Sequence, residues 1–166
     1  MLFFITLLML NSCNNTIDTS ILYYKAISEY IKELPEVKSS CVSVSDTIVH
    51  LELTNFWEEL SKDTSKSNDV LFMELDSIDN SRFFENYAMP QLQSFNQKAS
   101  GDSCEYTLFF SKVYNNMVMA ELINNRENMS NNHYLLTSFN KSRIFLFRFD
   151  LEKKINKVYS KELEYD

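Results

Sequence analysis

Glycine is almost missing from this chain of 166 residues, which contains a single one, Gly101, beside two prolines. Phosphate-binding loops and dinucleotide-binding fingerprints need several glycines where the backbone approaches a phosphate group. A Gly-x-Ser-x-Gly nucleophile elbow is also absent. We therefore exclude these nucleotide-binding and hydrolase classes, and we expect Asn, Asp and Ser to form the turns.

Histidine and cysteine are also scarce, with two and three residues. The sequence has no His-Glu-x-x-His motif and no pair of Cys-x-x-Cys motifs, so it lacks the local signature of a zinc site. The residue types of a Ser-His-Asp triad are present, but nothing in the sequence marks a nucleophile. We accordingly predict no metal ion, no cofactor and no catalytic residue.

Positive charge is outweighed by negative charge. Sixteen Lys and Arg residues stand against 23 Asp and Glu residues, which gives a net charge of −7. Contacts with phosphate dominate the affinity of proteins for nucleic acids, so we expect no nucleic-acid partner. The apolar content of 45%, with 14% aromatic residues, is too high for a disordered chain and predicts a packed core.

Long apolar runs are absent as well. A membrane-spanning helix needs about 20 apolar residues, whereas the apolar stretch at the N-terminus runs only from Leu2 to Leu10 and includes Thr6. This length suits the apolar core of a secretory signal, which usually has about 7–15 residues. No charged side chain precedes Asp18, so nothing opposes insertion of this stretch into a membrane.

The apolar stretch ends in the sequence Leu10-Asn11-Ser12-Cys13. It resembles the lipobox of bacterial lipoproteins, which has the pattern Leu-x-small-Cys. The resemblance implies that Cys13 receives a diacylglycerol thioether and that cleavage follows Ser12. Two or three acyl chains such as palmitate then anchor the protein, because each buried CH₂ group contributes about 0.8 kcal/mol. We therefore expect a lipoprotein of the bacterial cell envelope.

This resemblance also predicts the organisation of the chain. Residues 1–12 form the signal peptide, residues 13–18 form a lipidated tether, and residues 19–166 form one domain of ordinary size. Two alternatives remain open. The signal could be removed without lipidation, or residues 2–10 could form a buried strand or helix of a cytosolic domain.

The other two cysteines, Cys41 and Cys104, form an even pair if Cys13 is acylated. In an oxidising compartment they could join in a disulfide, which would close a long loop and contribute about 3–4 kcal/mol. Two unpaired thiols are the alternative. The spacing of the two residues does not decide between them, because a disulfide depends on the geometry of the Cβ atoms.

Three segments have the features of helices. Apolar residues recur every three or four positions through residues 19–34, and Pro35 ends this amphipathic pattern. Asn55 begins a short second helix, with an acidic residue three positions later. Residues 81–99 predict a third helix, in which Pro90 causes a kink or a break.

Strand patterns dominate the last third of the chain. Five strands are expected there, at residues 106–113, 117–123, 133–139, 143–149 and 155–163. Two more are expected earlier in the chain, at residues 41–53 and 70–75. The strand at 41–53 is interrupted at Asp46. Tyr114-Asn115-Asn116 is expected to form a hairpin turn, and the lysines of the strand at 155–163 are expected to protect a sheet edge. We predict an α+β fold, with helices on one face of a curved antiparallel sheet that ends in a C-terminal meander.

One group of titratable residues deserves a chemical interpretation. His50 and Glu52 would point to one face of their strand, because successive side chains alternate. Glu74 and Asp76 would lie beside them if the two strands pair. Such a group could carry out acid–base chemistry, although a solvated strand face is the simpler interpretation.

Aromatic residues outside the clear apolar faces suggest a second kind of site. Large, stiff and amphipathic side chains are good anchors for a protein, peptide or glycan. The residues are Tyr23, Tyr24, Trp57, Tyr87, Tyr106, Tyr114 and Tyr134. The alternative is that most of them complete the core.

These observations favour a non-enzymatic binding or accessory protein, anchored to the membrane through its lipid. It would bind an unknown protein or glycan through a sheet face or through the polar loop at residues 124–132. A tethered hydrolase of envelope polymers is one alternative. A periplasmic inhibitor or immunity protein is another, because an acidic surface suits a basic toxin.

Overall fold

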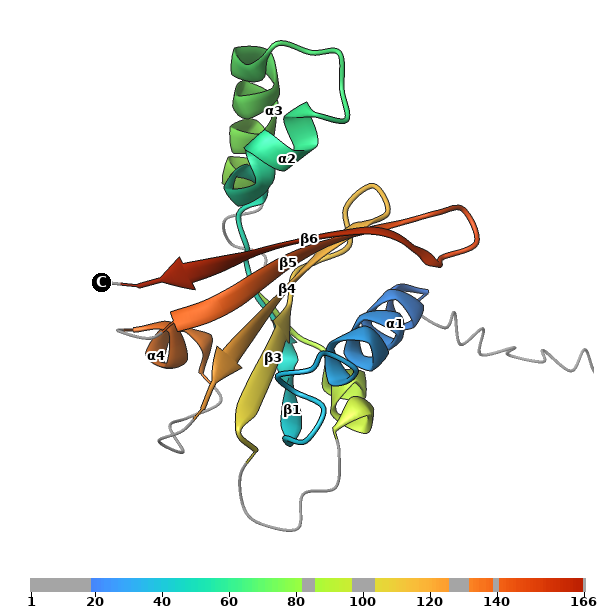
Figure 1. Ribbon diagram of the computed structural model, residues 1–166, viewed down its shortest axis with the longest axis vertical. Helices are drawn as coiled ribbons and strands as arrows, with labels where there is room; N and C mark the ends of the chain where they lie inside the picture. Colours follow the sequence, from blue (N-terminus) through green and yellow to red (C-terminus); the bar gives the residue numbers. More distant parts are fainter. Residues whose placement is uncertain (1–18, 82–85, 97–103, 126–131, 139–140, 166) are drawn as a thin grey trace, which may run out of the picture.

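The computed structural model describes residues 19–81, 86–96, 104–125, 132–138 and 141–165. These residues form an open, six-stranded sheet with helices packed against it (Figure 1). The strand order is β2-β1-β3-β4-β5-β6, and all neighbours are antiparallel except β1 and β3, which run parallel. The predicted α+β fold is confirmed, and the sheet is mostly antiparallel, with one parallel pair that the sequence did not predict.

Most of the described helices lie in the first half of the chain, and most of the strands lie in the second half. The helices are α1 (Ser20–Lys32), α2 (Trp57–Ser61), α3 (Asn68–Ser81) and α4 (His133–Thr137), with 3₁₀ turns η1 (Leu53–Phe56) and η2 (Pro90–Phe95). The strands are β1 (Val42–Ile48), β2 (Tyr87–Ala88), β3 (Tyr106–Phe110), β4 (Met117–Asn124), β5 (Lys141–Phe149) and β6 (Ile155–Glu164).

Helix α1 agrees with its sequence pattern. The centre of its apolar stripe is covered, and Tyr24, Ile27 and Ile31 are each 0% exposed. The Tyr24 hydroxyl donates to the backbone carbonyl of Ser111 at 3.1 Å, so its polar atom is satisfied inside the core. Burial of the apolar stripe therefore fixes this helix on the sheet.

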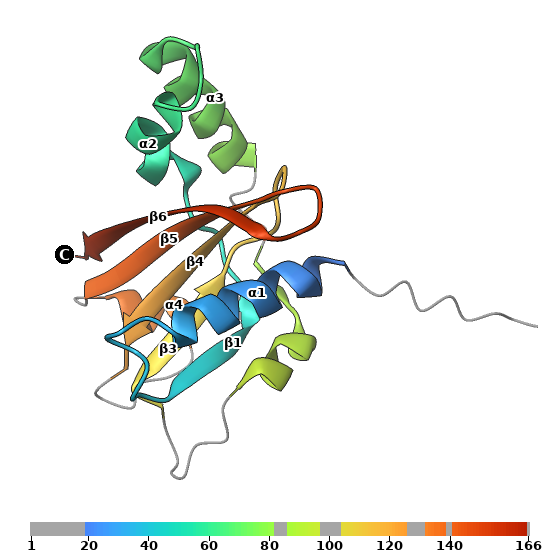
Figure 2. The ribbon, with the colours of Figure 1, turned by 45° about the vertical axis from the view of Figure 1, so that its right-hand side comes forward.

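The central strands bury side chains on both faces, and Figure 2 shows α1 lying across one of these faces. Side chains alternate along a strand, so Leu108 and Phe110 pack with α1 and η2 on one face. Phe109 points the other way and packs with residues of η1, α2, α3 and α4. The expectation that all helices lie on one face is therefore wrong, because the central strands have apolar residues on both sides.

The C-terminal strands largely follow the sequence prediction. Asn115 and Asn116 have φ values of 46° and 58° and make the turn between β3 and β4, which is confirmed as an antiparallel hairpin. Asparagine tolerates this left-handed conformation better than most residues. Strand β6 is an edge strand, as predicted, and it pairs with β5 over its length.

Residues 70–75 were expected to form a strand but lie within α3. A short apolar run does not distinguish a buried strand from part of a helix. Residues 133–139 were also expected to form a strand, yet His133–Thr137 is the helix α4. The side chain of Asn132 accepts a hydrogen bond from the Leu135 amide and so caps the start of that helix.

The predicted helix over residues 81–99 is also wrong where the structure describes it. Strand β2 and the 3₁₀ turn η2 occupy this part of the chain. Pro90 stands at the start of η2, where its missing N–H has no cost. The expected interruption at Asp46 appears as an irregular register between Val44 and Ile48 in the pairing of β1 with β3.

Cys41 and Cys104 are joined by a disulfide, with their Cα atoms 4.7 Å apart. Cys41 directly precedes β1, and Cys104 lies two residues before β3. Because these strands are parallel neighbours, their starting ends bring the two cysteines together. The bond links the chain on either side of α2 and α3.

Candidate functional site

Helix α3 leaves part of its apolar surface uncovered. Leu71 and Leu75, four residues apart, point into the core. Val70, Phe72 and Met73 instead remain 48%, 45% and 71% exposed. Scattered apolar residues are normal on a protein surface, but a group on one helix marks a contact site.

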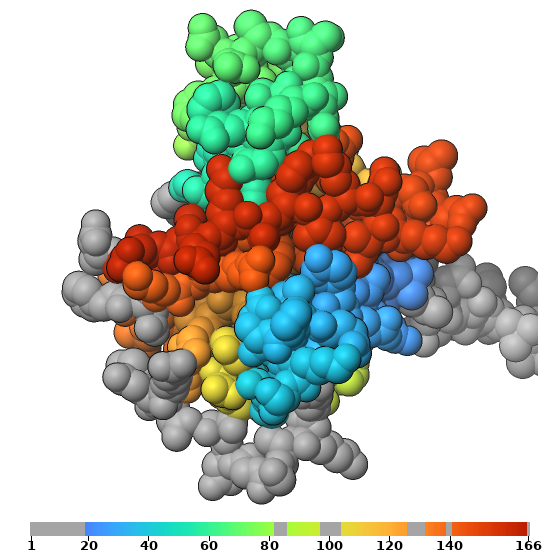
Figure 3. Space-filling view, viewed as in Figure 1, coloured from blue at the N-terminus to red at the C-terminus, as the bar shows by residue number. Residues whose placement is uncertain are grey.

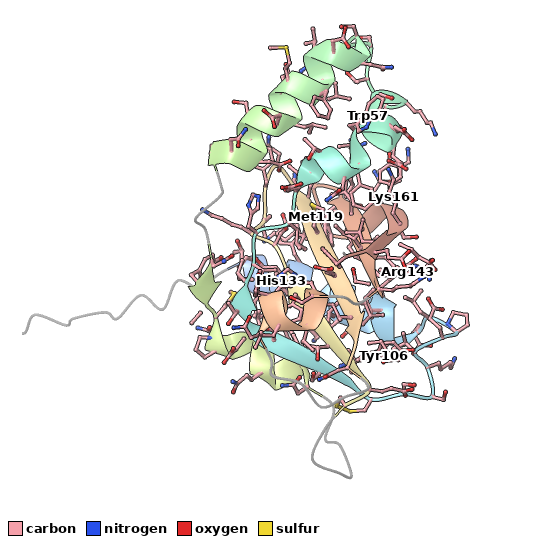
Figure 4. All side chains as sticks on the ribbon, turned by 90° about the vertical axis from the view of Figure 1, so that its left-hand side faces the viewer. Trp57, Tyr106, Met119, His133, Arg143 and Lys161 are labelled. Atoms are coloured by element: carbon pink, nitrogen blue, oxygen red, sulfur yellow. A yellow bond between two sulfur atoms is a disulfide. The ribbon has the colours of Figure 1, made fainter. Side chains whose placement is uncertain are left out.

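The helices α2 and α3 project beyond the β6 edge of the sheet (Figures 1 and 3). α3 packs against α2 and η1. The edge of Trp57 on α2 meets the ring of Phe72, with centroids 6.4 Å apart, and Figure 4 shows Trp57 in this projecting part. Phe72 is therefore held in place although it is half exposed.

Buried Asp79 fixes the orientation of α3. Its two carboxylate oxygens accept hydrogen bonds from the backbone amides of Leu53, at 2.8 Å, and Thr54, at 2.9 Å. These amides begin the turn η1, where backbone donors lack partners within the turn. Asp79 thus caps η1 from a neighbouring helix and holds α3 in a fixed orientation.

A pocket of about 540 Å³ lies beside the exposed side chains of α3. It is lined by Val70, Met73, Glu74, Ser77 and Ile78 of α3 and by Tyr114 of the β3–β4 hairpin. We call this lining, together with Phe72, the α3 surface. Its aromatic and aliphatic side chains surround few polar groups, a composition typical of binding sites.

An exposed ionic network ties the loop between α2 and α3 to the sheet. The Asp63 carboxylate accepts hydrogen bonds from Lys157 at 2.7 Å, Arg148 at 2.6 Å and the hydroxyl of Tyr159. The hydrogen bonds from Lys157 and Tyr159 lower the pKa of Asp63, and the bond to Asp63 raises the pKa of Lys157. These contacts favour the charged forms of Asp63 and Lys157.

The sheet also contains a buried carboxylate, that of Glu121 on β4, which is 0% exposed. Its Oε2 lies 2.6 Å from Nε2 of His133 on α4. Its Oε1 accepts hydrogen bonds from the hydroxyls of Ser142, at 2.5 Å, and Tyr165, at 2.7 Å. All of these partners stabilise a charged carboxylate inside the protein.

The charge state of Glu121 follows from these contacts. Burial by itself raises the pKa of the Glu121 carboxyl, but His133 and the two hydroxyls hold it below its ordinary value. Burial and the nearby Glu121 carboxylate raise the pKa of the Tyr165 phenol well above its ordinary value. Tyr165 thus stays a donor to a carboxylate that keeps its charge.

Two pockets adjoin His133, and His50 lines both of them. Glu52 and Tyr165 line the first, of about 320 Å³, and Tyr134 lines the second, of about 380 Å³. Figure 4 shows His133 at the α4 face of the sheet. The edge of the His133 ring meets Phe109, with centroids 4.9 Å apart, so the ring is held by packing as well as by Glu121.

The structure brings together only part of the predicted acid–base group. His50 and Glu52 share a pocket. Glu74 pairs instead with Lys66, and Asp76 accepts a hydrogen bond from Asn80 at 3.0 Å, both on the exposed surface of α3 or its preceding loop. The predicted pairing fails because residues 70–75 form a helix, not a strand beside β1.

The predicted aromatic anchors divide between core and surface. Tyr23 and Tyr24 are buried in the core, while Tyr87 and Tyr134 are exposed. Trp57, Tyr106 and Tyr114 are partly buried. Of these, only Tyr114 lines the α3 pocket, so the aromatic residues do not form the single patch that the sequence suggested.

Some predicted features lie outside the described residues. These are the signal peptide at residues 1–12, the lipidation site Cys13, the tether at 13–18 and the centre of the loop at 124–132. Within the described ranges, no helix is long and apolar enough to cross a membrane. In the same residues, no group of three His, Cys, Asp or Glu side chains is placed to hold a metal ion.

The sequence contained weak signals for the features it did not predict. Glu121 interrupts an apolar strand and shares its strand face with Met119 and Ile123, which marks it as buried. On a helix, Val70 and Met73 lie on a different side from buried Leu71. This pattern can be recognised only when the segment is read as a helix.

Comparison with known proteins adds no relative: no protein-family model, curated protein or solved structure matches this chain. The function therefore has to be argued from the α3 surface and the Glu121 cluster themselves.

Proposed function

We propose that this protein is a lipid-anchored protein of the bacterial cell envelope that binds a partner protein through its α3 surface. The observation that carries the proposal is the exposure of Val70, Phe72 and Met73 beside an apolar pocket. Covering such side chains removes apolar area from water, which contributes about 25 cal/mol per Å². A protein partner fits this surface better than a glycan, because the surface has few polar groups.

The predicted anchor gives such a surface its mechanism. Acylated Cys13 would hold the chain at the membrane, and the seven residues up to Ser20 extend at most about 24 Å. The domain would therefore stay close to the bilayer. Confinement raises the effective concentration of the domain toward a partner in the same membrane, so a modest contact area suffices.

The anchor is tested by intact mass and by incorporation of labelled palmitate in a bacterial host. The expected result is a mass increase on Cys13, loss of residues 1–12, and loss of the label in Cys13→Ala. Cys104→Ala is the matched control and should keep the label. An unmodified chain that retains residues 1–12 would contradict the anchor.

The binding surface is tested by photo-crosslinking in cells. A p-benzoylphenylalanine at position 73 should give a discrete crosslinked product, because Met73 is exposed within the α3 surface. The same residue at position 151 is the control, since Leu151 is 96% exposed in the β5–β6 turn and does not line the α3 pocket. Identical products at both positions, or none at 73, would overturn the proposal.

A tethered hydrolase is the second candidate, favoured by the His133–Glu121 pair beside two pockets. A carboxylate that orients an imidazole is a common element of acid–base catalysis. This candidate predicts soluble fragments from purified peptidoglycan, and no fragments with His133→Gln. The binding proposal predicts no release by either protein.

A further inference from the structure

The α3 surface follows the helix for about two turns. Val70, Met73, Ser77 and Ile78 recur at helical spacing and line one side of the pocket, with Tyr114 opposite. From Val70 to Ile78 the helix rises about 12 Å, at 1.5 Å per residue. The pocket volume of about 540 Å³ leaves room for several side chains of an occupant. The pocket is therefore a shallow, open groove along one side of the helix.

The charges on α3 all have one sign. The helix from Asn68 to Ser81 carries four acidic residues and no Lys or Arg. Asp79 is buried under η1, but Asp69, Glu74 and Asp76 are exposed. Lys66, in the preceding loop, pairs with Glu74 and offsets one of the three charges. Among the described residues, no ion pair is found for Asp69 or Asp76, so the exposed face of α3 combines apolar side chains with these two carboxylates.

We infer that the occupant of this groove is an amphipathic helix of a partner protein, with an apolar stripe flanked by Lys or Arg. This inference rests on the proposed function and specifies the chemistry of the partner. Helices bind such grooves through apolar side chains at positions i, i+3, i+4 and i+7. Basic residues beside that stripe would meet the exposed acids of α3, which increases both specificity and the association rate.

The same charges argue against other occupants. A second copy of this chain would place one acidic α3 against another, and like charges at an interface oppose association. Anionic lipid and nucleic acid carry the same sign as α3 and are disfavoured for that reason. A basic partner also agrees with the net charge of −7 for the whole chain.

The test uses a defined probe, a 14-residue fluorescent peptide of Leu and Lys with helical spacing. A peptide of the same pattern with Glu in place of Lys is the matched probe. The mature acylated chain is placed in nanodiscs of zwitterionic lipid, and binding to empty nanodiscs is subtracted. We expect saturable binding of the Lys peptide at one site, at least tenfold tighter than the Glu peptide, and weaker at high salt.

Two variants separate the α3 surface from general charge attraction. Met73→Lys and Leu151→Lys each replace one exposed apolar residue by Lys, so they change the net charge equally. Met73→Lys should weaken binding at least tenfold, and Leu151→Lys should leave it within about twofold. Circular dichroism and the unfolding midpoint verify that both variants fold, as their high exposure predicts.

Three outcomes overturn the inference: no saturable binding, equal affinity for the Lys and Glu peptides, or equal losses in the two variants. These failures are distinct from failure of the proposed function. A crosslinked partner at position 73 without binding of the Lys peptide would retain the function and reject the basic helix. No crosslink at position 73 would reject the function itself.

Discussion

Helices α1 and α3 have nearly the same length, 13 and 14 residues, but α1 buries more of its apolar side chains than α3 does. α1 buries Tyr23, Tyr24, Ile27 and Ile31 against the sheet and leaves Leu22 and Tyr30 exposed at its flanks. α3 buries Leu71 and Leu75 and leaves Val70, Phe72 and Met73 in solvent. The difference suggests that α1 is needed for folding, whereas the outer side of α3 can change without cost to the fold and is free to bind.

The largest expected effect comes from truncating one apolar side chain on each helix. Ile27→Ala leaves a cavity in the covered core, and we expect the free energy of unfolding to fall by about 2–5 kcal/mol. Met73→Ala removes an exposed side chain, and the change should stay within about 0.5 kcal/mol. Equilibrium unfolding in urea measures both. Equal losses of unfolding free energy in the two variants would contradict the proposed difference between the two helices.

The disulfide should have the next largest effect, because it closes the loop that contains α2 and α3. Replacing Cys41 and Cys104 with Ser should lower the free energy of unfolding by about 2–4 kcal/mol, mainly by releasing the unfolded chain. The peptide affinity of the α3 surface should stay within about twofold, since neither cysteine touches it. A large loss of peptide affinity in a folded variant would show that the α3 surface depends on the disulfide, which would contradict this prediction.

The Glu121 cluster should make stability depend on pH. Its folded pKa is lowered, so its contribution is fully present above the ordinary value of 4.5 and is lost as the pH falls through the folded pKa. Glu121→Gln should cost about 1–3 kcal/mol at neutral pH, where a charged acceptor is lost. The free energies of unfolding of the native protein and of Glu121→Gln should converge as the pH falls from 7 to 3. A gap that stays constant over this range would contradict the assigned charge.

The Asp63 network should give the smallest effect. Asp63→Asn removes the charge that pairs with Lys157 and Arg148 at the surface, where water and salt weaken ion pairs. We expect a smaller loss of stability than for Glu121→Gln, and one that shrinks further at 1 M salt. Thermal unfolding at low and high salt measures it. A loss larger than that of Glu121→Gln would show that this network, not the Asp79 cap, positions α2 and α3.

The sequence predicted local features better than contacts between distant segments. α1 was found from its periodicity, and the β3–β4 turn was found because Asn115 and Asn116 adopt left-handed conformations easily. The run at 70–75 was misassigned, because strands and helices both contain short apolar runs. This error hid the α3 surface, which depends on helical spacing.

The Glu121 cluster could not be predicted from local patterns. Its four members come from β4, α4, β5 and the residue after β6, and only the fold brings them together. The unexpected helix at His133 makes the contact with Glu121, where a strand was expected. His50 and Glu52 were identified as candidates, but their pocket partner is His133, not the acids of α3.

Hydrogen exchange on the mature chain, with and without the Leu–Lys peptide, tests the central claim most directly. Without the peptide, the backbone amides of α1 should exchange more slowly than those of α3, because α1 packs against the core. Added peptide should slow exchange in α3 and leave α1 unchanged. Protection that appears on α1, or equally on both helices, would contradict the assignment of α3 as the binding surface.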